Sequence, residues 1–516
     1  MKTKLPIWLM DLLISLFIAL FLGAVLAAFS IGAFLHSWLV FGILLLVSVF
    51  VLLRTWHYFG SSRSLAVLIA VTFFIRLIVA VVVSAGLPVW GYDNPVNNAG
   101  YLYSDAYNRD QAAFKLAAGT QPLTTAFTNP DKSDQYGGLL FLSAAVYRTF
   151  SPDADRALLI SLLAAFAMSL GLAFFGAAVQ KRWSLHVAVM ASWVMALFPD
   201  SVLLGSSQMR EPFLIALASI AFWAVLVWKA VPLRSIIVSL VTLIIACLLS
   251  LPAGGIFIAI LAATLILEWS LEQTRPVLRF IGFSVLILFF LGAIAAGWMW
   301  LRSTLYFDSY RSMMQSGWIQ GLMRTYGERW MIPFTSVYGL MQPVLPAALV
   351  DPALPIWQTV AIFRALGWIV ILPFLFFGFF SVWKAKPSDS KWLLVLFNLI
   401  FLFWVIIASM RSGGDQWDNP RYRYMLLPFM AILIAWSIDL FQKTHSPWFW
   451  RWVAVFGEFF LFFMNFYINR YVNIGTNISL FKMIALIIGI AFIILAGGLV
   501  WDSVNRKPKE IPINHG

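Results

Sequence analysis

Long apolar runs recur along the whole chain and are separated mostly by short polar connections. Most runs approach the roughly 20 residues that a helix needs to cross a hydrocarbon layer about 30 Å thick. The pattern therefore predicts an all-α polytopic membrane protein with about fourteen transmembrane helices. The predicted ranges are 7–29, 32–53, 65–86, 157–180, 184–199, 212–228, 233–251, 253–268, 279–300, 357–383, 392–409, 424–441, 451–470 and 479–500.

The lysine and arginine residues of the short connections predict the orientation of these helices, because cytoplasmic loops are enriched in both. With the N-terminus inside and an even number of spans, the short outer connections 30–36 and 252–255 carry neither. The inner connections then hold Lys2, Lys4, Arg54, Arg63, Lys181, Arg182, Lys229, Arg234, Arg275, Arg279, Lys384, Lys386, Lys391, Lys443, Arg451, Arg506, Lys507 and Lys509. We expect an integral protein of the plasma (inner) membrane with both termini in the cytoplasm.

One apolar stretch, 137–147, is too short to span a membrane, and counting it as a span would move Lys181 and Arg182 to the outside. We interpret it as a helix that lies in the outer interface or dips in and returns. A single transmembrane domain, 1–516, then has two long outer segments, 87–156 and 301–356. Both are longer than simple connectors, and functional side chains concentrate in such segments.

Composition excludes a soluble enzyme with an added anchor, because 62% of the residues are hydrophobic and only 11% are charged, against about 25% in soluble domains. The net charge of +13 comes from residues beside apolar runs, which indicates topology and contact with anionic membrane lipids. No basic stripe interleaved with aromatic residues indicates nucleic-acid binding. The one cysteine, Cys247, excludes an intramolecular disulfide and a multi-cysteine metal site.

The first long outer segment contains the most informative helix, predicted over 105–119 with an apolar stripe on one side. Asp105 lies at its start, where an aspartate is often only a helix cap. A carboxylate beside outer-face cations could instead take part in chemistry, and the pattern alone leaves both interpretations open.

Three stretches resemble the polytopic glycosyltransferases of the GT-C class, which use polyprenyl-phosphate sugars, and in particular their family-39-like, mannosyltransferase-like members. The stretches are Ser104-Asp-Ala-Tyr107 with the helix to Gly119, the apolar helix and loop over 136–156, and Asn419-Pro-Arg-Tyr-Arg-Tyr-Met-Leu-Leu-Pro428. A fourth, weaker match runs from Phe198-Pro-Asp-Ser to Gln208-Met-Arg-Glu-Pro212. The chain departs from the family where Gly137-Gly138 replaces a common Pro-Pro pair and where directly adjacent acids are absent from the first loop.

The resemblance implies that Asp105 is the catalytic carboxylate, acting as general base on the acceptor hydroxyl in an inverting hexosyl or pentosyl transfer. It also implies that cationic and polar side chains at the outer surface bind the substrates. The implied substrate-binding residues are Arg423, Arg421, Arg411, Arg210, Glu211 and Tyr107. Snorkelling of the arginines at the interface and a structural Arg210–Glu211 ion pair are the ordinary alternatives.

No metal ligand set is identified, because the five histidines are scattered over both faces. The cofactor stays unknown, and a divalent cation bridging Asp105, Glu211 and a phosphate is compatible with the resemblance. We expect most of the other first-loop acids to be solvated, namely Asp93, Asp110, Asp131 and Asp134.

Three charged residues lie in or near apolar runs. Asp11 and Glu458 are interpreted as structural, and mid-span Arg76 is expected to pair with an acid on another helix. The segment 301–356 is interpreted either as a cover over the lipid-linked sugar or as an amphipathic interfacial segment.

The function that we expect is transfer of a sugar from a polyprenyl-phosphate donor to a lipid, glycan or protein acceptor of the cell envelope, on the outer face of the membrane. An envelope glycan polymerase or ligase is the first alternative, although such proteins usually lack an acid at the start of a first-loop helix. A lipid-linked-sugar flippase or transporter is the second, and it predicts internal repeats and polar mid-membrane groups, which are scarce here.

Overall fold

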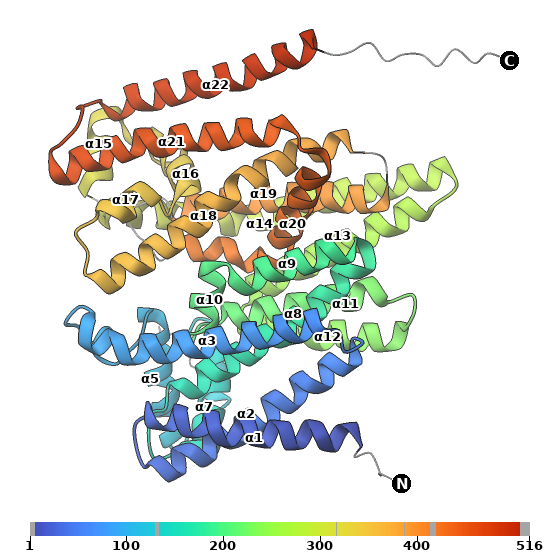
Figure 1. The fold of residues 1–516 in the computed structure, drawn as a ribbon, viewed down its shortest axis with the longest axis vertical. Coiled ribbons are helices and arrows are strands. Elements are labelled where there is room, and N and C mark those ends of the chain that lie inside the picture. The colour runs from blue at the N-terminus through green and yellow to red at the C-terminus, as the bar shows by residue number, and fades with distance from the viewer. Residues whose placement is uncertain (1–5, 129–133, 316, 386–387, 413–418, 506–516) are drawn as a thin grey trace.

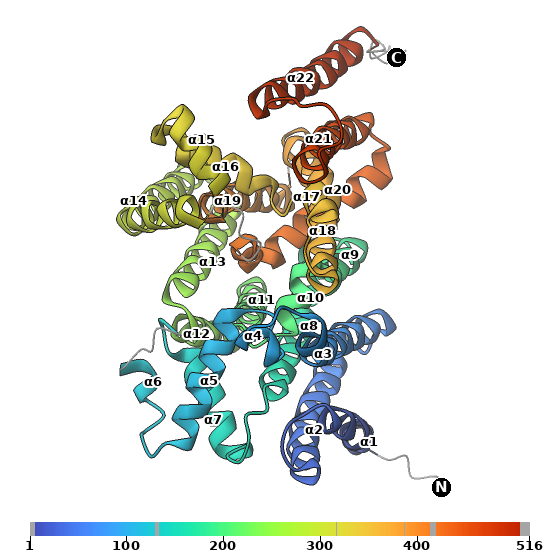
Figure 2. The same ribbon diagram turned by 90° about the vertical axis from the view of Figure 1, so that its left-hand side faces the viewer.

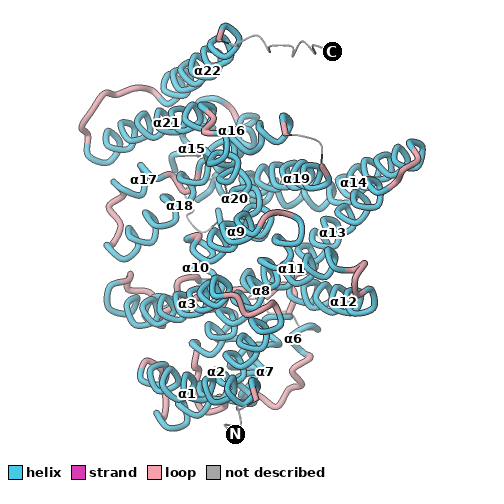
Figure 3. Tube along the Cα trace, turned by 45° about the vertical axis from the view of Figure 1, so that its right-hand side comes forward, coloured by secondary structure: helices cyan, strands magenta, loops and turns pink. Residues whose placement is uncertain are grey.

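The computed structural model describes residues 6–128, 134–315, 317–385, 388–412 and 419–505, and these residues form helices and loops without any strand (Figure 3). This confirms the predicted all-α fold. The helices in chain order are α1 (Ile7–Ala28), α2 (Phe34–Tyr58), α3 (Arg63–Trp90), α4 (Pro95–Asn98), α5 (Ser104–Ala118), α6 (Thr125–Thr128), α7 (Gly138–Phe150), α8 (Leu158–Arg182), α9 (Leu185–Leu197), α10 (Pro199–Gly205), α11 (Glu211–Val227), α12 (Pro232–Leu249), α13 (Leu251–Glu272), α14 (Pro276–Gln315), α15 (Gly317–Tyr326), η1 (Glu328–Trp330), α16 (Met331–Met341), α17 (Leu345–Val350), α18 (Pro355–Ser381), η2 (Val382–Lys384), α19 (Asp389–Ser412), η3 (Asn419–Leu426), α20 (Leu427–Thr444), α21 (Pro447–Val472) and α22 (Leu480–Val504).

Within the described residues, twelve helices are long and apolar enough to cross a membrane, and the count becomes thirteen if the bent pair α9–α10 is one span. The chain is therefore an integral membrane protein, with a count slightly below the predicted fourteen. The two predicted spans that are not among the twelve are α9 and α11. The helix α9 ends at a 58° bend, and α11 is a shorter apolar helix of 17 residues. Each of the fourteen predicted ranges nevertheless contains a helix.

The long helices lie side by side and are stacked along the longest axis of the molecule (Figure 1). The beginning of α1 and the end of α22 are on the same side of this view, and α5 and α15–α17 are on the other side. Figure 2 faces that other side and shows α4, α5 and α7 near the ends of α11 and α12. The two long segments of the sequence therefore lie at the opposite side of the bundle from the described chain ends.

The helices at the centre of the bundle are those with the most buried apolar windows: 72% of the window is buried in α8 and in the Arg421–Thr444 span, against 6% in α14 and 11% in α22. Small residues bring the central helices close together. A Cβ atom added to Gly171 of α8 would lie 2.5 Å from the Cα atom of Ala216 in α11. Such close backbone approach is a common basis of helix association in lipid, where no hydrophobic effect favours contact between helices.

The helix α7 is too short to span a membrane, as the sequence predicted, and two glycines fix its position. Gly137 has a φ of 77°, in the left-handed region that favours glycine. A Cβ atom on Gly138 would lie 2.3 Å from the carbonyl oxygen of Leu248, at the end of α12. Gly137 and Gly138 are therefore required by the turn and by the contact with α12.

The bend between α9 and α10 explains the mid-span arginine. Pro199 begins α10 and has no backbone N–H, so carbonyl groups near the end of α9 lose their helical donors. Arg76 of α3 is fully buried and donates hydrogen bonds to the carbonyl oxygens of Ala196 (3.1 Å) and Met195 (3.3 Å) and to the hydroxyl oxygen of Ser201 (2.7 Å). The expectation that Arg76 pairs with an acid was wrong, because the bend supplies its acceptors.

A buried ion pair joins α10 to α18. The Nε atom of Arg364 donates to Oδ1 of Asp200 at 2.6 Å, and both side chains are almost fully buried. Removing one member of such a pair leaves the other charge desolvated, which is far more costly than losing an exposed pair.

We therefore predict that Asp200→Ala lowers the free energy of unfolding by about 3–5 kcal/mol, measured by thermal unfolding in detergent micelles. Glu272→Ala is the matched control, because Glu272 pairs with Lys229 and both side chains are about half exposed. The control should change stability by less than about 1 kcal/mol. Equal effects of the two substitutions would contradict a stabilising role for the buried pair.

Candidate functional site

Three segments distant in the sequence meet at one cluster of charged side chains: the start of α5, the start of α11 and the helix η3. Asp105 is the second residue of α5, and the residue before the helix is Tyr103, whose side chain makes no capping hydrogen bond. Asp105 therefore lies in the first turn and is not the N-cap residue. Its carboxylate oxygen Oδ2 accepts a hydrogen bond from Nη2 of Arg421, a residue of η3.

Arg421 is the central cation of this cluster, and 7% of its side chain is exposed, against 51% for Asp105. Its Nε atom lies 4.0 Å from Oε1 of Glu211, the first residue of α11. The centre of its guanidinium is 5.6 Å from the ring centroid of Tyr103 and 5.5 Å from that of Tyr422. The guanidinium thus lies between two carboxylates and beside two aromatic rings.

Glu211 and its neighbour Arg210 each carry a buried polar atom that has no hydrogen-bond partner among the described residues. Oε2 of Glu211 and Nη1 of Arg210 are buried and make no hydrogen bond to any described residue. The guanidinium of Arg210 lies 5.2 Å from the ring centroid of Tyr136. Buried polar groups in native proteins are normally satisfied, so these atoms indicate a place where a polar ligand can supply the missing partners.

A third arginine, Arg109, lies one turn after Asp105 on α5 and is almost fully buried. Its Nη1 atom donates to the carbonyl oxygen of Gln208 (3.1 Å), and its Nε atom lies 3.8 Å from Oδ2 of Asp134. Asp134 also accepts hydrogen bonds from the backbone N–H groups of Tyr136 (3.3 Å) and Leu140 (3.0 Å), which fixes the start of α7. The sequence analysis missed Arg109, although its spacing of four residues from Asp105 could have indicated it.

These contacts give a cluster of three guanidinium groups and three carboxylates, made up of Arg109, Arg210, Arg421, Asp105, Asp134 and Glu211. Burial raises the pKa of Asp105, but Arg421, then Arg109 and Arg210, outweigh this effect, and the pKa lies below its ordinary value. Burial is also the main cause that lowers the pKa of Arg109. The carboxylate of Asp105 is therefore ionised at neutral pH while it stays beside Arg421.

Arg423, two residues after Arg421, points into the protein. It is fully buried, and its guanidinium donates hydrogen bonds to the carbonyl oxygens of Leu340 (3.1 Å) and Gln342. It also lies 4.0 Å from the ring centroid of Trp368. These contacts attach η3 to the end of α16, so the structure brings Arg421, and not Arg423, to Asp105.

Tyr107, which the sequence also singled out, does not join the cluster. Tyr107 is partly buried and packs edge-on against Tyr101, with ring centroids 5.4 Å apart. Arg411 belongs to the end of α19, and its side chain lies outside the described residues.

The other first-loop acids divide into exposed and buried groups. Asp93 is exposed, as expected, and Asp131 lies outside the described residues. The expectation of solvation was wrong for Asp110 and Asp134, which are 1% and 2% exposed. Folding buries both because each binds groups on α7 or next to it.

Asp110 holds α5 against α7. Its Oδ2 atom accepts hydrogen bonds from the hydroxyls of Tyr101 (2.6 Å) and Tyr147 (2.7 Å). At the end of α5, Arg148 of α7 donates to the carbonyl oxygens of Leu116, Ala117, Gly119 and Gln121. Both contacts fix the orientation of α5, and with it the position of Asp105.

The described residues of the cluster do not provide the ligand set of a divalent-cation site. Among the described residues no three His, Cys, Asp or Glu side chains come together in a way that could hold a metal ion. Asp105 and Glu211, the pair that the resemblance offered for a bridging cation, both lie beside the guanidinium of Arg421. A guanidinium therefore stands where a bridging cation would have to bind.

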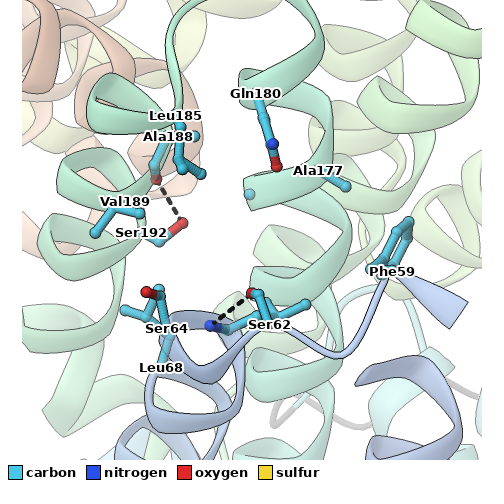
Figure 4. Close-up of a pocket in the computed structure, with 12 residues that line it drawn as sticks. Phe59, Ser62, Ser64, Leu68, Ala177, Gln180, Leu185, Ala188, Val189 and Ser192 are labelled. Carbon is cyan, nitrogen blue, oxygen red and sulfur yellow. Dashed lines mark hydrogen bonds between the residues drawn. The ribbon is translucent and has the colours of Figure 1, made fainter. Parts of the chain in front are cut away.

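A separate crevice between α3, α8 and α9 has a different character (Figure 4). Its polar side chains are the neutral Ser62, Ser64, Gln180 and Ser192, and the rest of its lining is apolar. Without a titratable group the crevice offers neither a general base nor a cation for phosphate. The charged cluster around Arg421 is the better candidate for chemistry.

The burial of Asp110 predicts a pH dependence of stability. Burial, followed by the neighbouring Asp155, raises the pKa of Asp110, although the two tyrosine hydroxyls oppose this. The folded protein therefore binds a proton more tightly than the unfolded chain, whose carboxyl has a pKa of about 4. The stabilisation that protonated Asp110 gives the folded protein is therefore full below the pKa of the unfolded chain. It is lost as the pH rises through the raised pKa of the folded protein. Asp110→Asn should flatten the decrease of melting temperature with rising pH, and an unchanged slope would contradict it.

Comparisons with known proteins leave the family open. No protein-family model matches the sequence, and no curated protein matches it. Among solved structures, the chain is similar to the archaeal oligosaccharyltransferase AglB from Archaeoglobus fulgidus, in complex with an inhibitory peptide and a dolichol-phosphate. The match has a TM-score of 0.36 and 14% sequence identity, and it covers 84% of this chain and 55% of the AglB chain. This chain thus spans little more than half of that protein, and a similarity of this size does not establish a family.

Proposed function

We propose that this protein is a glycosyltransferase that moves a sugar from a polyprenyl-phosphate donor to a hydroxyl group of a cell-envelope lipid, glycan or protein. The observation that carries the proposal is the meeting of a half-exposed carboxylate, Asp105, with the buried guanidinium of Arg421. Two further arginines and a buried glutamate with an unsatisfied oxygen surround them. The resemblance of the segments around 104–119 and 419–428 to GT-C glycosyltransferases points to the same residues.

The reaction requires a base and an anion-binding group at one place. The acceptor oxygen attacks the anomeric carbon as its proton passes to a carboxylate oxygen of Asp105. The bond between the anomeric carbon and the phosphate oxygen breaks, and the polyprenyl phosphate leaves with the electron pair. The protonated Asp105 then returns its proton to water. A single displacement of this kind inverts the configuration at the anomeric carbon.

The arginines of the cluster stabilise the leaving group. Guanidinium groups bind phosphate oxygens through paired, charge-assisted hydrogen bonds. Arg421 and Arg210 carry this role, and the unsatisfied Nη1 atom of Arg210 is an available donor. Burial strengthens the interaction, because the effective dielectric constant around Arg421 is lower than in water.

The position of the cluster agrees with a lipid-bound donor at the outer face. The helix α5 lies on the opposite side of the bundle from the beginning of α1 and the end of α22 (Figure 1). The basic short loops of the sequence favour the cytoplasm for the chain ends. The proposed site then faces the outside, where envelope acceptors are located.

Asp105→Asn tests the role of the base. Asparagine has nearly the same shape but cannot accept the proton, so we predict that transfer from a polyprenyl-phosphate sugar falls at least about a hundredfold while the protein keeps its melting temperature within a few degrees. Asp93→Asn is the matched control in the same segment, because Asp93 is exposed and its partner is Asn98. Near wild-type transfer by Asp105→Asn would remove Asp105 from the mechanism.

A comparison of Arg421→Ala with Arg423→Ala tests the role in phosphate binding. Arg421→Ala should weaken binding of polyprenyl phosphate about tenfold or more, since charge-assisted hydrogen bonds contribute roughly 1.5–3 kcal/mol. Arg423→Ala should instead lower the melting temperature, because it removes contacts to Leu340, Gln342 and Trp368. Lipid titration and thermal unfolding in detergent measure the two effects, and the reverse assignment would contradict the proposal.

A further inference from the structure

The two carboxylates beside Arg421 differ in their freedom to move. Glu211 is 7% exposed in its side chain and begins a helix in the protein interior, whereas the side chain of Asp105 is 51% exposed. Asp105 also lies inside the first turn of α5 and is not its N-cap residue, which is Tyr103. Of the two, Asp105 can turn away from Arg421 into water with little loss of contact.

The hydrogen bond between Asp105 and Arg421 conflicts with both roles that the reaction gives to these residues. Nη2 of Arg421 donates to the carboxylate of Asp105, and the same N–H groups are the ones that bind a phosphate oxygen bidentately. A carboxylate held by a guanidinium is also a weak base, since the ion pair favours its deprotonated form. While this hydrogen bond is formed, it occupies a donor of Arg421 and makes the carboxylate of Asp105 a weaker base.

We propose that the phosphate of the donor displaces Asp105 from Arg421, so that the carboxylate becomes available to the acceptor hydroxyl only after the donor has bound. This inference rests on the proposed function and adds its order of events. The phosphate replaces the carboxylate of Asp105 as the anion bound to Arg421. The guanidinium therefore keeps an anionic partner throughout the exchange. Glu211 stays beside Nε and keeps the guanidinium in position during the exchange.

The exchange predicts an unusual effect of Asp105→Asn on binding. In lipid nanodiscs, a polyprenyl phosphate without a sugar should bind Asp105→Asn roughly three to ten times more tightly than wild type, because the competing ion pair of this partly exposed residue is lost. Asp93→Asn should bind like wild type. Equal or weaker binding by Asp105→Asn would overturn the inference.

A double-mutant cycle separates displacement from general charge repulsion. The affinity for the same polyprenyl phosphate is measured for Arg421→Gln with and without Asp105→Asn, with Arg109 and Arg210 still present to hold the phosphate. If Asp105 competes for Arg421, the gain from Asp105→Asn disappears in this background. A gain of the same size in both backgrounds would mean only that a negative charge repels the lipid, and it would overturn the inference.

The affinity measurements test the displacement of Asp105, whereas the sugar-transfer assay tests the proposed function. The two proposals can therefore fail separately. If Asp105→Asn loses sugar transfer but binds the lipid as wild type does, Asp105 is still supported as the base. The proposed displacement of Asp105 by phosphate is then contradicted. Retained transfer by Asp105→Asn would remove Asp105 as the base and this inference with it, whereas a wild-type protein that transfers no sugar would contradict the proposed function.

Discussion

Guanidinium groups satisfy backbone carbonyls at three places where helices of this membrane protein end or bend. A carbonyl group in hydrocarbon that lacks a donor costs several kcal/mol, and one arginine can supply donors to several carbonyls at once. Arg76 does this at the bend between α9 and α10, Arg148 at the end of α5, and Arg423 at the end of α16. These hydrogen bonds thereby attach the irregular segments to neighbouring helices.

This arrangement determines the candidate site. Arg148 and Asp110 hold α5, Asp134 holds the start of α7, and Arg423 holds η3, so the side chains between them have defined positions. Arg421, Arg210 and Arg109 belong to the same part of the molecule, but their partners are mainly carboxylates and aromatic rings. Guanidinium groups with such partners can exchange one anion for another, which is what binding of a lipid phosphate requires.

Much of the fold could be predicted from the sequence, because the length and apolar character of a membrane helix are properties of the local sequence. The short helices α5 and α7 could be predicted for the same reason. Details of the helix breaks could not: Pro199 indicates a helix start, but only the fold shows that Arg76 reaches the carbonyls freed by the bend. The burial of Asp110 and Asp134 likewise depends on how α5 and α7 pack.

The candidate site was predictable in part, through the motifs that place Asp105, Glu211 and Arg421 in separate segments of the chain. The sequence could not decide between Arg421 and Arg423, because residues two apart on a helix with three residues per turn point in different directions. Which direction faces the charged cluster depends on the packing of η3 against Trp368 and the end of α16. Arg109 was missed because an arginine inside an amphipathic helix is ordinarily a solvated residue.

The most direct measurement is an experimental structure of the protein in nanodiscs with a polyprenyl phosphate bound. The account predicts phosphate density within hydrogen-bond distance of the guanidinium groups of Arg421 and Arg210, with the Asp105 carboxylate turned away from Arg421 and facing the space where an acceptor enters. Phosphate density at any other place, with the Asp105–Arg421 pair intact, would contradict it.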